Sequence, residues 1–308
     1  MTDNRVYRTR SAGVPGSGIA DQYADGTAAQ LWELYIGDKD QRTQKYKEFI
    51  TGVLRENKCK NILDAACGTG VDSIMLLEEN FNLTSVDLSD KMLKYALKTR
   101  WKRRKEAAFD AWVIEEANWL TLTEDIEGIE TFDAVVCLGN SFAHMPDISG
   151  DGSEHKRAIE NFAAMVKPGG ILLIDHRNYD YIIEHGQAPS NNIYYNSNHI
   201  EGIKTSVLLQ DGAAKLITLD YRMRIDTVQD TKCDTDSKTA KKGRLGNVTS
   251  GNFRLSYFPH LVKKFGSLLS EVFGPGSEHK VYGDFKPVKE AKDPAFFIHV
   301  IKKPPAKS

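Results

Sequence analysis

The sequence lacks several features that would assign it to a class of proteins at once. It has only 4 cysteines in 308 residues, and their spacing is not that of a zinc site. We therefore expect reduced thiols rather than a disulfide framework, and no metal. No apolar stretch approaches the roughly 20 residues that cross a bilayer, and the polar first residues lack the apolar core of a secretory signal. These absences predict a cytoplasmic protein that is not associated with a membrane.

An excess of charge of one sign is also missing. The formal net charge is -1, from 41 basic and 42 acidic residues, which gives no general attraction to nucleic acid. One local exception is the run KTRWKRRK at residues 98–105, which a nucleic-acid-binding enzyme could use to contact phosphates. The run also lies at the end of a predicted helix, where the helix dipole favours cations. We favour this second interpretation and expect no nucleic-acid partner.

Both common glycine motifs for nucleotide binding are absent. Ser73 stands where GxGxxG would need its third glycine, and no Gly-Lys-Ser/Thr sequence follows. Instead, the apolar segment NILDA is followed by Gly68 and Gly70, and the next apolar segment ends in Asp87. Glycine permits a tight turn and a close backbone approach, and an acid after the next strand can accept both ribose hydroxyls. A loop without a phosphate-binding lysine favours a ligand with a ribose and no phosphate, such as S-adenosylmethionine.

The order of the predicted elements indicates an α/β fold with an insertion. Between residues 61 and 176, strongly apolar strands alternate with helices, which predicts a parallel sheet covered on both faces. Beyond this point, alternating and aromatic-rich segments with a turn at Asp211 and Gly212 predict an antiparallel unit. The segments KVYGDF and AFFIHVIKK are predicted to return to the main sheet. The predicted division is an arm at 1–20, a core at 21–175 and 251–308, and an inserted substrate or lid domain at 176–250.

Five motifs occur in the order found in class I S-adenosylmethionine-dependent methyltransferases. They are DAACGTG, SVDLSD, EEANW, CLGNSFAH and KPGGILLIDHRNY. Together with DQYADG, LWELYIGD, NIYYNS, TLDY and FRLSYFPH, they make the chain resemble the glycine N-methyltransferase family from about residue 5 to 302. The resemblance implies a Rossmann-like methyltransferase sheet with a small inserted antiparallel lid domain. It also implies a reaction in which glycine and S-adenosylmethionine give sarcosine and S-adenosylhomocysteine.

The resemblance also implies a set of residues that bind S-adenosylmethionine. These are Tyr23, Trp32, Tyr35, Arg42, Ala66, Gly68, Gly70, Asp87, Leu88, Ser89, Asn118, Trp119, Leu138, Gly139, Ser141 and His144. Arg42 would meet the methionine carboxylate, while Asn118 would bind the adenine amine and Trp119 would cover the ring. Core packing is the structural alternative for Trp119, and a buried structural imidazole is the alternative for His144.

A second set of residues is predicted to bind glycine. Arg177 follows the fifth predicted strand, and a guanidinium binds a carboxylate in a fork that fixes its orientation. Asn140, after the fourth strand, could accept a hydrogen bond from the substrate amine. The resemblance makes Tyr195, Tyr221 and Tyr257 a lid over the site. Methyl transfer from a sulfonium moves a positive charge without creating one, so alignment of the reactants and exclusion of water are the expected contributions of the protein.

The resemblance further implies a homotetramer that is inhibited by 5-methyltetrahydrofolate bound between subunits. The arm keeps VYRTRS at 6–11, but VPGSGIA at 14–20 departs from the family pattern and leaves cooperativity open. The polar segment 229–252 also departs from the pattern and is predicted to be a dispensable loop. Two alternatives stay open at this point: a methyltransferase that acts on sarcosine, dimethylglycine or another small amine, and a regulatory folate-binding protein.

Overall fold

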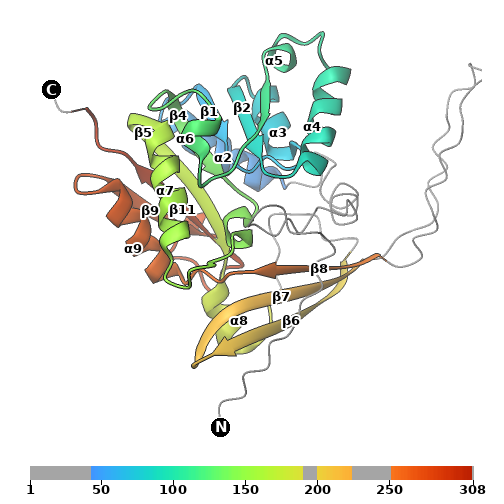
Figure 1. Ribbon diagram of the computed structural model, residues 1–308, viewed down its shortest axis with the longest axis vertical. Coiled ribbons are helices and arrows are strands. Elements are labelled where there is room, and N and C mark those ends of the chain that lie inside the picture. The colour runs from blue at the N-terminus through green and yellow to red at the C-terminus, as the bar shows by residue number, and fades with distance from the viewer. Residues whose placement is uncertain (1–42, 190–199, 224–250, 307–308) are drawn as a thin grey trace, which may run out of the picture.

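An eight-stranded mixed sheet forms the centre of the computed structural model, which describes residues 43–189, 200–223 and 251–306 (Figure 1). The strand order is β10-β9-β11-β5-β4-β1-β2-β3. Strands β1 to β5 pair in parallel, and β11 lies antiparallel between β5 and β9. The bounds are β1 (Asn61–Asp64), β2 (Asn82–Asp87), β3 (Val113–Glu116), β4 (Phe132–Cys137), β5 (Val166–Arg177), β9 (Glu278–Gly283), β10 (Lys286–Pro287) and β11 (Phe296–Lys302). The predicted parallel sheet, and the return of two late strands to it, are confirmed.

Helices cover both faces of this sheet, and α7 and α9 lie side by side on one of them (Figure 1). Successive side chains of a strand point to opposite faces. Leu172 accordingly packs in one cluster with Phe162 of α7, and Leu173 packs in the other with Ile50 of α2. Burial on both faces explains why the strands read as continuous apolar runs. The bounds are α2 (Gln44–Glu56), α3 (Val71–Glu78), α4 (Asp90–Lys102), α5 (Ala107–Asp110), α6 (Leu122–Asp125), the 3₁₀ helix η2 (Ser141–His144), α7 (Ser153–Met165), α8 (Tyr179–His185) and α9 (Val262–Phe273).

A second, three-stranded antiparallel sheet is formed by β6 (Ile200–Gln210), β7 (Ala213–Met223) and β8 (Gly251–Tyr257), in that order. Asp211 and Gly212 have φ values of 53° and 74°, as expected for a hairpin turn whose twist matches that of its strands. The predicted turn is confirmed. By its pairing, β8 belongs to this small sheet, although the predicted division placed residues from 251 onward with the core. Figure 1 shows the small sheet extending from one end of the large one.

Several sequence predictions concern residues outside the described ranges. Tyr23, Trp32, Tyr35, Arg42 and Tyr195 are among them, as are the arm at 1–20 and residues 229–250. Within the described ranges, no helix is both long enough and apolar enough to span a membrane.

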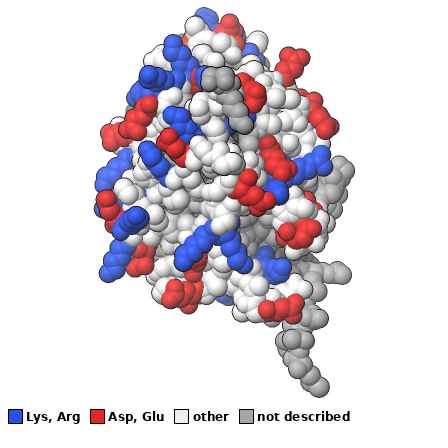
Figure 2. Space-filling view, turned by 90° about the vertical axis from the view of Figure 1, so that its left-hand side faces the viewer, with Lys and Arg blue, Asp and Glu red and all other residues white. Residues whose placement is uncertain are grey.

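The basic run at residues 98–105 covers the last turn of α4 and the turn after it. Arg103 forms ion pairs with Glu78 and Glu106 at 2.5 and 2.6 Å, and Arg100 donates to the backbone carbonyl of Asp110 at 2.9 Å. Figure 2 shows basic and acidic side chains intermingled over one face of the molecule. Part of the positive charge of the run is therefore used to hold α4 to its neighbours.

Candidate active site

The loop after β1 contains the two glycines that the sequence singled out. Gly68 and Gly70 have φ values of 54° and 90°, which side chains rarely adopt. A Cβ on Gly70 would lie 2.9 Å from Cη2 of Trp112, and one on Gly68 would lie 3.1 Å from Cε of Met92. Backbone conformation and close packing therefore require glycine at both positions, independently of any ligand.

Asp87 joins this loop to the end of β2. Its Oδ2 accepts a hydrogen bond from the amide of Gly68 at 2.8 Å, and its Oδ1 accepts one from the amide of Ser89 at 2.9 Å. Each carboxylate oxygen can accept more than one hydrogen bond, and the Asp87 side chain is only partly buried. Two backbone amides thus fix the Asp87 carboxylate at the carboxyl edge of the sheet.

Ser73 explains why this loop departs from GxGxxG. Its hydroxyl donates to Oδ2 of Asp64 at 2.5 Å and lies 2.8 Å from the hydroxyl of Ser85, which in turn accepts from Nε1 of Trp112 at 2.8 Å. Burial raises the pKa of Asp64 to about 7, against the opposing effect of the Ser73 hydrogen bond. The sequence analysis did not predict this buried network. The network fixes the start of α3 beneath the loop.

Trp119, predicted to cover an adenine ring, also packs into the core. Its Nε1 donates to the carbonyl of Ala65 at 2.6 Å. Its ring stacks on Phe142 at 5.6 Å and meets the edge of Phe162 at 5.6 Å. The side-chain oxygen of the neighbouring Asn118 accepts from the amide of Leu120 at 3.0 Å. Core packing is therefore part of the role of Trp119. The adenine contacts of Asn118 and Trp119 remain predictions.

The loop after β4 is held by an acid that the sequence interpretation missed. The fully buried Asp175 of β5 accepts hydrogen bonds from the amides of Gly139 and Asn140 at 2.9 and 2.6 Å. Both residues have positive φ, at 78° and 64°. The hydroxyl of Ser141 donates to the carbonyl of Leu138 at 2.8 Å. The hydrogen bonds from these two amides to one carboxylate therefore stabilise a turn at the sheet edge that would otherwise be strained.

The side chain of Asn140 is oriented differently from the sequence expectation. Its Oδ1 accepts from the backbone amide of Arg177 and from the hydroxyl of Tyr179, both at 2.9 Å. A backbone amide can only donate, so this contact fixes which end of the Asn140 amide is oxygen. The oxygen expected to accept from a substrate amine is therefore already occupied. The buried Nδ2 has no partner among the described residues and remains available as a donor.

Arg177 is the last residue of β5 and is 8% exposed. Its Nη2 donates to the hydroxyl of Tyr221 at 2.9 Å, and that hydroxyl lies 3.3 Å from the hydroxyl of Tyr257. Its guanidinium carbon lies 4.9 Å from the centre of the Phe296 ring. The structure thus brings the predicted arginine together with two of the three predicted tyrosines, which come from the small sheet.

His144 lies at the end of η2, with its ring 4.7 Å from that of Tyr257. Burial lowers the pKa of His144 to about 4, against a hydrogen bond with Ser256 that raises it. The imidazole is therefore neutral at neutral pH. It offers a hydrogen-bonding and stacking group at the site rather than a positive charge.

Three buried polar atoms in the carboxyl-edge loops have no hydrogen-bond partner among the described residues. They are Oγ1 of Thr69 after β1, Oγ of Ser89 after β2, and Nδ2 of Asn140 after β4. Buried polar atoms without partners are rare, since each costs free energy. Parallel strands place these loops at one edge of the sheet, where ligands of α/β proteins bind. The residues present therefore fit a polar ligand at this edge, and Thr69 is a contributor that the sequence interpretation did not name.

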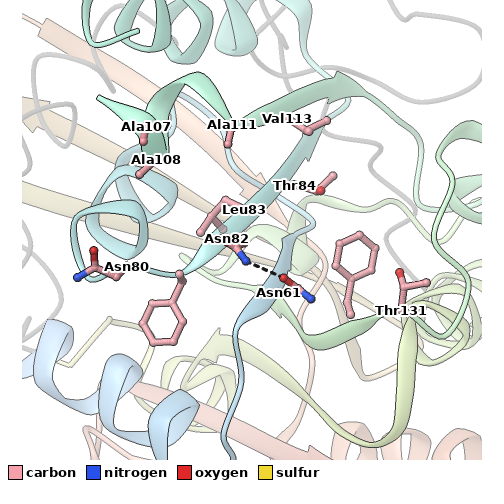
Figure 3. A pocket seen from close by; sticks show the side chains of 12 residues that line it. Asn61, Asn80, Asn82, Leu83, Thr84, Ala107, Ala108, Ala111, Val113 and Thr131 are labelled. Atoms are coloured by element: carbon pink, nitrogen blue, oxygen red, sulfur yellow. Dashed lines mark hydrogen bonds between the residues drawn. The ribbon is translucent and has the colours of Figure 1, made fainter. Parts of the chain in front are cut away.

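A separate hollow of about 670 Å³ lies at the amino ends of β1, β2, β3 and β4 (Figure 3). Asn82 donates to the side-chain oxygen of Asn61 across it at 2.9 Å, and alanines of α5 form part of its wall. None of the residues that line it is ionisable at neutral pH. Because it opens at the opposite edge from the loops described above, it is not the candidate active site.

Comparisons with known proteins first identify the fold of the large sheet. A family profile described as a methyltransferase domain matches residues 63–172. A solved S-adenosylmethionine-dependent methyltransferase from Clostridium acetobutylicum superposes with a TM-score of 0.59 at 18% identity, over 91% of this chain and 99% of that one. The sheet therefore has the class I methyltransferase fold.

Closer relatives narrow the assignment. The glycine N-methyltransferase of Rattus norvegicus is 56% identical over 306 residues, which cover 98% of this chain and 99% of the relative. The glycine/sarcosine N-methyltransferase of Halorhodospira halochloris is 31% identical, over 92% of this chain and 89% of that protein. The chain belongs to the glycine N-methyltransferase family.

Proposed function

We propose that the protein transfers a methyl group from S-adenosylmethionine to the amine of glycine, giving sarcosine and S-adenosylhomocysteine. The observation that carries the proposal is the buried side chain of Arg177 at the carboxyl edge of a methyltransferase sheet, where its guanidinium donates to Tyr221 and its backbone amide donates to Asn140. The planar fork of a guanidinium matches the two oxygens of a carboxylate, which fixes the orientation of the bound group. The 56% identity to a glycine N-methyltransferase supports glycine over other small carboxylates.

In this proposal, the carboxyl-edge loops bind S-adenosylmethionine. Asp87 accepts from the ribose hydroxyls, because two backbone amides fix its carboxylate at the carboxyl end of β2. The backbone of Ala66 and the two loop glycines lie beside the methionine part, and the residues after β3 and β4 bind the adenine. Tyr23, Trp32, Tyr35 and Arg42, which lie outside the described residues, are proposed to close over it.

Glycine would lie between the end of β5 and the small sheet. Arg177 pairs with its carboxylate, and Nδ2 of Asn140 donates a second hydrogen bond to the same group. Tyr221, which contacts both Arg177 and Tyr257, covers the substrate with Tyr257 and with Tyr195 from outside the described ranges. Because the carboxylate is fixed at two points, the amine is held on one line toward the methyl donor.

The methyl transfer itself requires no general acid or general base. The nitrogen lone pair forms the new C–N bond as the C–S bond breaks, and the positive charge passes from sulfur to nitrogen. The product amine afterwards loses one proton to solvent. The protein therefore contributes mainly by aligning nitrogen, methyl carbon and sulfur and by excluding water.

Three further properties belong to the proposal: a homotetrameric assembly, inhibition by 5-methyltetrahydrofolate and a cytosolic location. The family resemblance and the arm motif VYRTRS support the first two. The third is consistent with Cys59, Cys67 and Cys137, which are free thiols. Sedimentation analysis of the purified chain, and sarcosine formation measured with increasing methylfolate, would test assembly and inhibition.

Mass spectrometry of the reaction products tests the proposed reaction directly. The purified protein is incubated with S-adenosylmethionine and glycine, and parallel reactions contain sarcosine, dimethylglycine, alanine or RNA. Sarcosine formed from glycine is the expected result. Product from another acceptor but not from glycine would overturn the substrate while leaving the methyltransferase class intact. Methylfolate binding without any methyl transfer would favour a regulatory protein.

A further inference from the structure

Three histidines form a continuous hydrogen-bonded chain that ends on Arg177. Nδ1 of His176 lies 2.8 Å from the carbonyl oxygen of Arg177, and its Nε2 lies 3.0 Å from Nε2 of His299. Nδ1 of His299 lies 3.0 Å from Nε2 of His279, and Nδ1 of His279 lies 3.3 Å from the hydroxyl of Ser270. The chain therefore runs from the exposed surface of α9 to the backbone of the proposed carboxylate-binding residue.

The register of three neighbouring strands creates this chain. Phe297 of β11 lies opposite His176 of β5, so that His299, two residues further, is its diagonal neighbour on the same face. His279 of β9 lies opposite Ile301, which makes it the diagonal neighbour of His299 on the other side. His176 and His299 are fully buried, and α9 covers this face of the sheet.

Helix α9 packs directly against the histidine rings at Gly266 and Phe265. A Cβ at this position would lie 3.5 Å from Cε1 of His279 and 4.0 Å from Cε1 of His299. Phe265 of the same helix meets the rings of His176 and His299 edge-on, each at 5.3 Å. The imidazoles are therefore packed into fixed orientations rather than free to rotate.

The contacts allow one arrangement of protons when all three rings are neutral. The Arg177 carbonyl can only accept, so Nδ1 of His176 carries a hydrogen and its Nε2 accepts. It follows that Nε2 of His299 donates and its Nδ1 accepts, and that Nε2 of His279 donates. Nδ1 of His279 then accepts from Ser270. A second proton on His176 would face the Nε2 proton of His299, so this arrangement of protons holds only with a neutral His176.

The electrostatic surroundings agree with neutral rings. Burial lowers the pKa of His176 to about 4, although Asp180 and the hydrogen bond to Arg177 oppose the shift. Burial also lowers the pKa of His299 well below its usual value, with further lowering from its histidine neighbours, including His260. Burial lowers the pKa of His279 in the same direction. At neutral pH each ring can therefore donate at one nitrogen and accept at the other.

We propose that His176 is a positioning residue for substrate binding, whose orientation is set by His299 and His279. Asn140 holds the amide of Arg177, and His176 holds its carbonyl, so that the residue is clamped on both sides while its guanidinium contacts Tyr221. The inference rests on the proposed role of Arg177 in binding the glycine carboxylate. It adds that the histidine chain, through this clamp, determines how well Arg177 is placed.

Two pairs of variants test the role of the chain. His176→Phe keeps an aromatic ring but removes both nitrogens, and His176→Asn keeps a donor near the Nδ1 position. His299→Leu removes both contacts of the central ring, and His299→Gln keeps one donor and one acceptor. We expect the Phe and Leu variants to raise the KM for glycine about tenfold, with the KM for S-adenosylmethionine unchanged. The Asn and Gln variants are expected to show clearly smaller increases, and His185→Gln, at an exposed histidine of α8, serves as the control.

A measurement on the unchanged protein makes the test independent of folding. Nitrogen-15 chemical shifts of labelled histidines report the tautomer of each ring, and we expect Nδ1–H for His176 and Nε2–H for His299 and His279. Other tautomers, or a protonated His176 at neutral pH, would overturn the chain. A glycine KM that does not change in His176→Phe and His299→Leu would overturn the positioning role. Failure of the Arg177 assignment would appear separately, as an unchanged glycine KM in Arg177→Lys.

Discussion

The side-chain oxygen of Asn140 accepts a hydrogen bond from the backbone amide of Arg177 at 2.9 Å, which ties the loop after β4 to the end of β5. The same loop is tied a second time, because Asp175 of β5 accepts from the amide of Asn140 at 2.6 Å. The two residues proposed to bind the substrate carboxylate are therefore parts of one rigid unit. Each of the following substitutions changes one contact of the carboxyl edge.

Arg177→Lys is expected to raise the KM for glycine by about 10- to 100-fold, equivalent to about 1.4 to 2.8 kcal/mol. Lysine keeps the charge but loses the planar fork and the contact geometry with Tyr221. Steady-state kinetics at saturating S-adenosylmethionine measures the effect. Arg254→Lys, at an exposed pair with Asp220, is the matched control and should leave the KM unchanged. A normal glycine KM in Arg177→Lys would remove this residue from the substrate site.

Asn140→Asp is expected to lower kcat/KM for glycine at least about 100-fold. The new side chain can still accept from the amide of Arg177, but it replaces the free Nδ2 donor by an oxygen that repels the substrate carboxylate. Kinetics with glycine at neutral pH provides the measurement. Asn82→Asp, at the opposite edge of the sheet, makes the same chemical change on the exposed surface and should have little effect. Equal activity of the two variants would contradict a donor role for Asn140.

Asp87→Asn is expected to weaken the binding of S-adenosylmethionine at least about tenfold. The amide can accept from Gly68 or from Ser89 with its single oxygen, but its NH₂ group would face the other backbone amide. Titration calorimetry with the methyl donor alone measures this change without turnover. Asp90→Asn, at an exposed carboxylate that pairs with Lys94, is the control. Unchanged affinity in Asp87→Asn would show that the ribose lies elsewhere.

Stability is expected to fall steeply below pH 6.5. Burial lowers the pKa of His144 and His176 to about 4, and lowers the pKa values of His260 and His299 well below the usual value. Near pH 5, unfolding therefore takes up about four protons on these groups, since unfolded histidine has a pKa of about 6.5. Asp64, with its pKa raised to about 7, has the opposite sign and releases one. Because unfolding takes up about three protons in total, the free energy of unfolding falls by about 4 kcal/mol for each unit by which the pH is lowered.

Urea unfolding at several pH values between about 5 and 7 checks this slope. The histidine contribution is complete above about pH 6.5 and is lost as pH falls toward 4. The Asp64 contribution is complete below its unfolded pKa, near pH 4, and is lost as pH rises through about 7. Asp64→Asn removes this opposing group. The dependence of the free energy of unfolding on pH near pH 5 should therefore become steeper, by an amount that corresponds to about one more proton taken up on unfolding. A free energy of unfolding that stays constant over this range would contradict neutral buried histidines.

Local patterns in the chain were sufficient for the fold class. Continuous apolar strands between helices predicted the parallel sheet, because burial on both faces leaves no polar alternation. The Asp-Gly dipeptide predicted the hairpin between β6 and β7, because positive φ at two successive positions restricts the turn to few residue types. By contrast, no local pattern indicated that β8 pairs with the small sheet, since pairing depends on partners distant in the chain.

The sequence predicted several residues of the candidate site, but not all of the contacts between them. The sequence named Arg177, Asn140 and Tyr221, which the structure places in direct or shared contact. The oxygen of Asn140, expected to accept from the substrate amine, is occupied by Arg177 and by Tyr179, to which the sequence interpretation assigned no role. Hydrogen bonds between side chains from different strands leave no periodic pattern in a sequence.

Residue type and spacing, which the sequence determines by itself, were enough for the methyltransferase sheet, the glycine loop and the acid after β2. Those features are local, because each depends on neighbouring residues and on the period of one strand or helix. Only the tertiary structure decided which way the Asn140 amide points, that Asp175 holds the loop after β4, and that His176, His299 and His279 form one chain. Each of these depends on the register of strands that are far apart along the chain, and a shift of one residue would turn every side chain involved to the other face.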